Sequence, residues 1–114
     1  MTAFIKYVTF DCADPRGLAA FWSEVTGYQP VANEDDFAAL AAPDNRGVRG
    51  ILFWRVPEPR TAKSRMHVDL ATKDAEHEIE RLVGIGATMV EFREGQGSSW
   101  TVMLDPEGNE FCIG

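Results

Sequence analysis

The sequence predicts an α+β fold built from two paired βαβββ modules. Two observations lead to this fold class. The order of one strand, one helix and three strands occurs twice along the chain, and short stretches of one half match stretches of the other. Two copies are too few for a solenoid, which needs about three or more repeats to bury its faces. We therefore expect a single domain, with module one at about residues 1–58 and module two at about 64–114.

The first module begins with a predicted strand, "FIKYVTFD" at residues 4–11, which is rich in β-branched and aromatic residues. Asp14 followed by Pro15 is typical of a helix N-cap and its first helical position, and Gly27 stands where a glycine ends a helix. Strand-like runs separated by turn residues then begin at Tyr28, Phe37 and Gly50. The order in this half is strand, helix and three strands.

The second module follows the same order. "MHVDLA" at residues 66–71 predicts a strand, Asp74 is a helix N-cap, and Gly84 and Gly86 mark the end of that helix. The apolar helix positions Ala75, Ile79, Leu82 and Val83 are expected to share one face, and strand-like runs begin at Ala87, Trp100 and Asn109.

Direct alignment makes the repeat explicit. "YVTFDCAD" from Tyr7 matches "HVDLATKD" from His67, and "TGYQPV" from Thr26 matches "IGATMV" from Ile85. Each matched pair occupies the same place in its half, the first strand or the end of the helix. The two halves are therefore two copies of one unit, and we expect them to close one pocket between them.

Composition restricts the classes of partner. The net charge of −7 disfavours nucleic acid, because binding to phosphates depends on Lys and Arg side chains. No segment approaches the roughly 20 apolar residues of a membrane span, so we expect no membrane partner and a cytoplasmic location. Cys12 and Cys112 form no C-x-x-C pair and are expected to be free thiols.

Several motifs carry a family resemblance. "FW" followed by "TGY", the second-half "RMHVDL" and the closing "DPEGNEFCIG" resemble the vicinal oxygen chelate superfamily, which contains glyoxalases, ring-cleaving dioxygenases and bleomycin or fosfomycin resistance proteins. The resemblance covers almost the whole chain and is closest to the glyoxalase-like branch of small bacterial proteins. It implies two paired modules whose curved sheets form a cleft, which holds a divalent metal in many members.

The resemblance also implies four positions for metal ligands. Carried onto this chain by motif, they are Tyr7, His67, Phe53 and Cys112, the last two placed by aligning "GILFW" with "NEFCI". Only His67 is a usual ligand. Phe53 cannot bind a metal, and His with Cys is a poor site for Mg²⁺, Mn²⁺ or Ni²⁺ and an incomplete one for Zn²⁺. We therefore expect no metal and no other cofactor.

Strand alternation extends the candidate site, because side chains two residues apart point the same way. With Trp100 as a stacking surface, the predicted ligand-binding residues are Tyr7, Thr9, Phe53, Arg55, His67, Asp69, Trp100 and Cys112. Trp54 also lies beside the expected cleft, but as the neighbour of Phe53 it should face away from it. Other interpretations stay open: a polar core residue or a metal ligand for His67, a small buried side chain for Cys112, and a salt bridge among the charged residues.

Two functions follow from this site. The first is a metal-independent protein that binds a planar or aromatic small molecule in the cleft. The alternative is a glyoxalase-type lyase or isomerase, or a dioxygenase, with His67 as base or metal anchor. We favour binding, because the superfamily's chemistry relies on a metal whose usual ligands are missing here. A scaffold domain without a ligand is a third possibility. We also expect a homodimer, since large aromatics on short strands leave an apolar face to cover.

Overall fold

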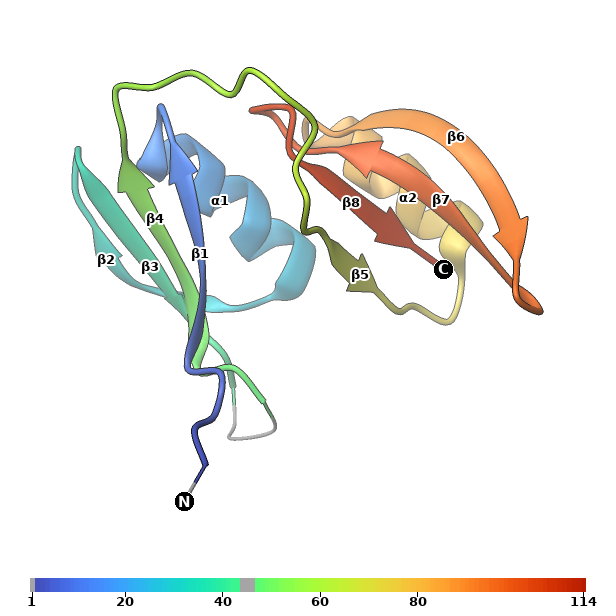
Figure 1. The fold of residues 1–114 in the computed structure, drawn as a ribbon, viewed down its shortest axis with the longest axis horizontal. Coiled ribbons are helices and arrows are strands. Elements are labelled where there is room, and N and C mark those ends of the chain that lie inside the picture. The colour runs from blue at the N-terminus through green and yellow to red at the C-terminus, as the bar shows by residue number, and fades with distance from the viewer. Residues whose placement is uncertain (1, 44–46) are drawn as a thin grey trace. The chain divides into compact units, whose positions relative to one another are not determined.

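The computed structural model describes residues 2–43 and 47–114. It divides into two compact units, Met1–Pro59 and Arg60–Gly114, each of which holds one helix and one four-stranded mixed sheet (Figure 1). The order of elements in each unit is strand, helix and three strands. The predicted fold class, α+β with two βαβββ modules, is therefore confirmed.

In the first unit the first and last strands pair in parallel, and the other pairs are antiparallel. The sheet order is β1-β4-β3-β2. The elements are β1 (Tyr7–Cys12), α1 (Pro15–Thr26), β2 (Gln29–Asn33), β3 (Phe37–Ala41) and β4 (Gly50–Arg55).

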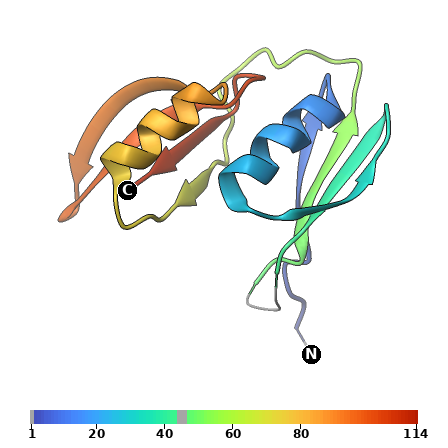
Figure 2. The same ribbon diagram turned by 180° about the vertical axis from the view of Figure 1, so that it is seen from behind.

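The second unit repeats this topology, with the sheet order β5-β8-β7-β6 and a parallel pair between β5 and β8. In each unit the helix lies against one face of its own sheet (Figure 2). The elements are β5 (Val68–Leu70), α2 (Ala75–Gly84), β6 (Thr88–Gly95), β7 (Ser98–Leu104) and β8 (Glu110–Ile113).

The helix boundaries follow the predicted caps. The Asp14 side chain accepts a hydrogen bond from the Gly17 N–H at 3.2 Å, and Asp74 accepts one from the His77 N–H at 3.1 Å. Gly27 adopts a left-handed φ of 77°. Its N–H donates to the Ser23 carbonyl at 2.8 Å, which closes the last turn of α1. The caps at both helix starts and the glycine after α1 are therefore confirmed.

A β-bulge recurs at the same place in both units. The register of β2 against β3 shifts between Pro30 and Ala32, and that of β6 against β7 shifts between Met89 and Glu91. The residues skipped are Val31 and Val90, which occupy equivalent positions in the repeat of "TGYQPV" and "IGATMV". Because a bulge bends its strand and strengthens the local twist, the repeated motif encodes the same bend in each sheet.

Each unit has its own core beneath its helix. In the first, Phe10 stacks on Phe53 and on Trp22 of α1, with 5.5 Å between ring centroids in both pairs. Phe53 is fully buried and Trp22 is 1% exposed. In the second, the side chains buried most completely are Leu82, Met103, Phe111 and Ile113. Val83, predicted to share the apolar face of α2, is instead half exposed.

The "DPEGNE" turn between β7 and β8 is built around a buried carboxylate. One oxygen of Asp105 accepts hydrogen bonds from the N–H groups of Glu107 and Asn109, both at 2.9 Å. The Asn109 side-chain amide contacts both oxygens, at 3.1 and 2.9 Å, and Gly108 adopts a φ of 84°. The turn therefore fixes where β8 starts and which way its side chains face.

None of the helices in the described residues has the length and apolar character needed to cross a membrane.

Candidate ligand pocket

The second sheet has one buried face and one open face. In β7 and β8 the fully buried residues Met103 and Phe111 pair with each other, on the face that α2 covers. Side chains alternate along a strand, so Val102 and its partner Cys112 lie on the opposite face. This open face of the second sheet carries the candidate site.

A pocket of about 620 Å³ lies on this face. Its volume is within the roughly 300 to 1,000 Å³ typical of small-molecule sites. Every lining residue belongs to the second unit. The lining includes the predicted site residues His67, Asp69, Trp100 and Cys112, together with Lys63, Leu70, Arg93, Gly95, Gln96, Ser98, Ser99, Val102, Glu110, Ile113 and Gly114. Four of the eight predicted ligand-binding residues therefore lie around one pocket.

His67, Asp69 and Cys112 form a compact cluster in the lining of the pocket. His67, predicted to lie within a strand at residues 66–71, lies immediately before β5, because only Val68 to Leu70 pair with β8. The His67 Nε2 is 3.3 Å from the Asp69 Oδ1, and one donor atom from each of the three residues lies within 4.8 Å of the others. The cluster provides a nitrogen, an oxygen and a sulfur atom.

Cys112 is 7% exposed, and its surroundings oppose ionisation. Burial raises the pKa of the Cys112 thiol, and the carboxylate of Asp69 raises it further. The positive charges of Lys63 and Arg93 act in the opposite direction but do not reverse the shift. Since the pKa of an ordinary thiol already lies above neutral pH, the raised pKa keeps Cys112 a neutral thiol at pH 7. The thiolate, which is the form that acts as nucleophile and metal ligand, is therefore disfavoured.

The Asp69→Asn variant is expected to lower the pKa of Cys112, because it removes a negative charge that disfavours the thiolate. Alkylation by iodoacetamide at about pH 8 should therefore be faster in this variant than in the wild type. Peptide mass spectrometry would follow Cys112 separately from Cys12. An equal or slower rate in Asp69→Asn would contradict the assigned electrostatics.

Trp100 lines the pocket near the hairpin that joins β6 to β7. The indole ring lies over Gly95, because a Cβ at that position would be 3.4 Å from the ring, in ordinary van der Waals contact. The two strands are joined by Gln96 and Gly97, with φ values of 52° and 76°. Two consecutive positive φ values suit a two-residue hairpin whose twist matches the strands. This tight turn therefore positions Trp100 in the pocket.

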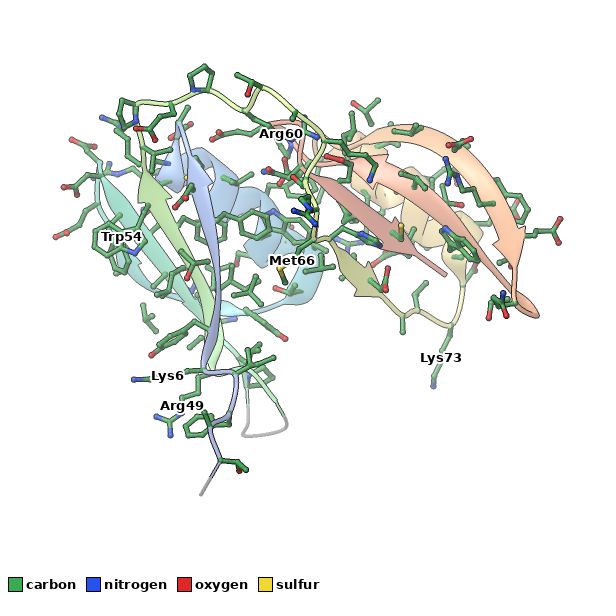
Figure 3. The ribbon with its side chains drawn as sticks, viewed as in Figure 1. Lys6, Arg49, Trp54, Arg60, Met66 and Lys73 are labelled. Carbon is green, nitrogen blue, oxygen red and sulfur yellow. The ribbon has the colours of Figure 1, made fainter. Side chains whose placement is uncertain are left out.

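Glu110 and Lys63 form the third part of the pocket lining, and the sequence reasoning missed them. The Glu110 side chain is only 10% exposed, and one oxygen pairs with the Nη2 of Arg60 (Figure 3). The Nζ of Lys63 lies 3.7 Å from the other oxygen. Strand alternation from Cys112 would have pointed to Glu110, since the two residues are two positions apart.

In the first unit the prediction that Phe53 shares a face with Tyr7 is wrong. Thr9 pairs with Leu52, whereas Phe53 pairs with Phe10 and is buried against α1. In the second unit Asp69, the repeat equivalent of Thr9, pairs with Cys112. Leu52 is therefore the counterpart of Cys112, and the predicted alignment of the last strands was off by one residue.

This one-residue shift also relocates Arg55, because a slip by one residue turns every side chain to the other face. Arg55 alternates with Phe53 and lies on the helix side at the exposed end of β4. Tyr7 and Thr9 lie on the opposite face, and both are exposed. The structure therefore does not bring Phe53 and Arg55 together with Tyr7 and Thr9.

Trp54 is on the face that carries Tyr7, contrary to the prediction that it points away. It alternates with Leu52 on β4 and contacts Phe37 of β3, with 4.3 Å between the ring centroids. The indole remains 47% exposed (Figure 3). The open face of the first sheet thus also presents aromatic surface.

Sequence comparison finds one matching family model, described as a glyoxalase-like domain, which covers residues 7–114. No curated protein matches the chain in sequence.

Solved structures share the fold at low sequence identity. A glyoxalase/bleomycin resistance protein/dioxygenase family enzyme from Burkholderia phytofirmans is 22% identical, with a TM-score of 0.79 and 97% of each chain covered. The fosfomycin resistance protein FosX from Mesorhizobium loti is 16% identical, with a TM-score of 0.75 and coverage of 99% of this chain and 92% of that one. The bleomycin-binding protein of Streptomyces verticillus, solved with copper(II)-bleomycin, is 17% identical, with a TM-score of 0.67 and coverage of 99% and 97%.

Proposed function

The chain belongs to the family of glyoxalase-like domains, and on this premise we propose that it binds a planar or aromatic small molecule without the help of a metal ion. The observation that carries the proposal is the 620 Å³ pocket on the open face of the second sheet. It combines an aromatic side chain, Trp100, with a few polar groups, as small-ligand sites usually do. Two relatives in fold are named for small molecules, bleomycin and fosfomycin.

The chemistry of the pocket supports binding over catalysis. Cys112 is a neutral thiol because burial raises its pKa. A neutral thiol is a weak nucleophile. The indole of Trp100, by contrast, offers a flat apolar surface that stacks on any planar ring. We also propose that the protein is a cytoplasmic homodimer that does not bind nucleic acid.

A ligand screen tests the proposed function. Aromatic metabolites and antibiotics are added to the protein, and hits are detected by tryptophan fluorescence and by a raised melting temperature. For a true hit, calorimetry should show that Trp100→Ala weakens binding by about 1 to 3 kcal/mol, through lost stacking and lost apolar contact.

The matched control is Phe92→Ala. Phe92 is an aromatic residue of β6 in the same unit and is 58% exposed, but it does not line the pocket. Its substitution should leave the affinity unchanged. Hits that are insensitive to Trp100→Ala, or equally sensitive to both changes, would show that the site lies elsewhere.

A metal-dependent enzyme is the second candidate, and the cluster of His67, Asp69 and Cys112 favours it. Nitrogen, oxygen and sulfur donors within 4.8 Å of one another suit Zn²⁺ better than Mg²⁺ or Mn²⁺. Asp69 supplies the carboxylate that the four ligand positions implied by the family resemblance lacked. When bound, a metal would supply Lewis-acid catalysis. Against it, ligation would have to deprotonate a thiol whose pKa burial raises.

Thermal melts distinguish the two candidates. With Zn²⁺, Ni²⁺, Mn²⁺, Mg²⁺ or EDTA, we expect the melting temperature to stay constant, and elemental analysis should find no stoichiometric metal. A metal that binds only the folded state at 100 times its dissociation constant would add about 2.7 kcal/mol. Stoichiometric metal that is lost in His67→Ala would contradict metal independence and favour the enzyme.

A further inference from the structure

Glu110 carries a buried carboxylate oxygen that is not satisfied. Its side chain is 10% exposed, and the residue lines the pocket. Oε1 is paired with Arg60, but Oε2 accepts no hydrogen bond from any described residue. A buried acceptor left without a donor is costly, more so when it is charged, and native structures contain few of them.

The nearest cation does not fill this role. The Nζ of Lys63 is 3.7 Å from Oε2, too far for a hydrogen bond, and the Lys63 side chain is 78% exposed. His67 is in contact with Asp69, with 3.3 Å between the Nε2 and Oδ1 atoms. Oε2 therefore forms no hydrogen bond with a described residue, and a ligand that reaches it would displace the exposed ammonium group of Lys63. The Arg60 ion pair on the other oxygen holds the carboxylate in place.

We propose that Glu110 determines the specificity of the pocket: the ligand donates an N–H hydrogen bond to its Oε2. This inference rests on the proposed function and narrows the ligand class to planar compounds with an amidine, amine or amide N–H at one end. A carboxylate or phosphate at that end would instead bring a second acceptor against an oxygen that needs a donor.

The strand register gives the length of such a ligand. Glu110 pairs with Leu104 of β7, and Trp100 lies four residues earlier on the same strand. At the rise of an antiparallel strand these four residues span about 13 Å. A compound that stacks on Trp100 and donates to Glu110 is therefore elongated, with its ring at one end and its N–H group at the other. Cys112 and Val102 lie between the two ends.

Two elongated probes of equal shape test this inference: para-phenylbenzamidine, which carries N–H donors, and para-phenylbenzoate, which carries only acceptors. Binding is measured by calorimetry at fixed ionic strength. Wild-type protein should bind the amidine more tightly than the benzoate. Glu110→Gln should weaken the amidine about tenfold to a hundredfold, because the amidinium loses the charge of the carboxylate and is left with at most a neutral amide acceptor. The Glu110→Gln variant should bind the benzoate as tightly as the wild type does, or more tightly.

Two further variants complete the design. Glu80→Gln removes one negative charge from α2, outside the pocket, and should change amidine binding less than twofold. Lys63→Met removes the ammonium group that competes for Oε2 and should tighten amidine binding severalfold. Because Lys63 is exposed, Lys63→Met is expected to fold. It therefore tests the role of Glu110 even if Glu110→Gln does not fold.

The possible results distinguish a failure of the inference about Glu110 from a failure of the proposed function. Preferred binding of the benzoate, with affinity lost in Trp100→Ala, would overturn the role of Glu110 and leave the proposed function standing. Amidine binding that is unchanged in both Glu110→Gln and Lys63→Met would overturn it equally. If neither probe shows binding that depends on Trp100, the proposed function fails, and this inference fails with it.

Discussion

Replacing Phe53 with alanine is expected to lower the free energy of unfolding by about 3 to 5 kcal/mol, the usual cost of removing a phenyl group from a packed core. Phe53 is fully buried, and its ring stacks on Phe10, which in turn stacks on Trp22. The substitution would leave a cavity beneath α1 and remove an aromatic pair. Urea unfolding, followed by circular dichroism, measures the loss.

Leu52→Ala is the matched control for Phe53→Ala. Leu52 is the preceding residue of the same strand, but it faces the other side of the sheet and is only partly buried. Its substitution should cost less, about 1 to 2 kcal/mol. If Leu52→Ala were the more damaging change, the assignment of the two faces of β4 would be wrong.

The second large effect is expected at Asp105, which is 3% exposed. Asp105→Ala removes the acceptor of two backbone N–H groups and of the Asn109 amide. Each donor left unsatisfied costs about 1 to 3 kcal/mol, although water entering the turn offsets part of it. We expect the free energy of unfolding to fall by about 3 kcal/mol, as measured by urea unfolding.

Asp69→Ala is a suitable comparison for Asp105→Ala. Asp69 is a carboxylate in the same unit whose side chain is 77% exposed, and its loss should change stability by no more than about 0.5 kcal/mol. Similar costs at both positions would show that the turn does not depend on the buried carboxylate.

The features predicted correctly from sequence are those with local chemical signals. Asp14, Asp74 and Gly27 cap their helices through hydrogen bonds to residues three or four positions away. Such contacts do not depend on the rest of the fold. The repeat was also readable, and it extends to a bulge at Val31 and Val90 that was not foreseen.

The alignment of the last strands was wrong because their hydrophobic pattern does not show which side chains face the helix. "GILFW" is apolar at almost every position, so alternation cannot show which side chains face the helix. Phe53 and Leu52 were equally plausible candidates for the buried face. The pairing of β1 with β4 distinguishes them, and that contact joins strands about forty residues apart.

Glu110 was overlooked for a related reason. A glutamate next to a turn usually lies on the surface, and nothing near it in sequence indicates burial. Its ion-pair partner, Arg60, is fifty residues away and comes from the segment that leads into β5. His67 and Cys112, which were predicted from motifs, line the pocket, whereas the placement of Glu110 beside them depends on tertiary contacts.

The measurement that tests the central claim most directly is an amide nitrogen–proton NMR titration of the protein with para-phenylbenzamidine. The spectrum reports every backbone amide and the indole N–H of each tryptophan. We predict that the largest shifts arise at Trp100, Cys112 and Glu110, and that they persist in EDTA. Shifts confined to the first unit, or shifts that disappear when EDTA is added, would contradict a metal-independent pocket on the second sheet.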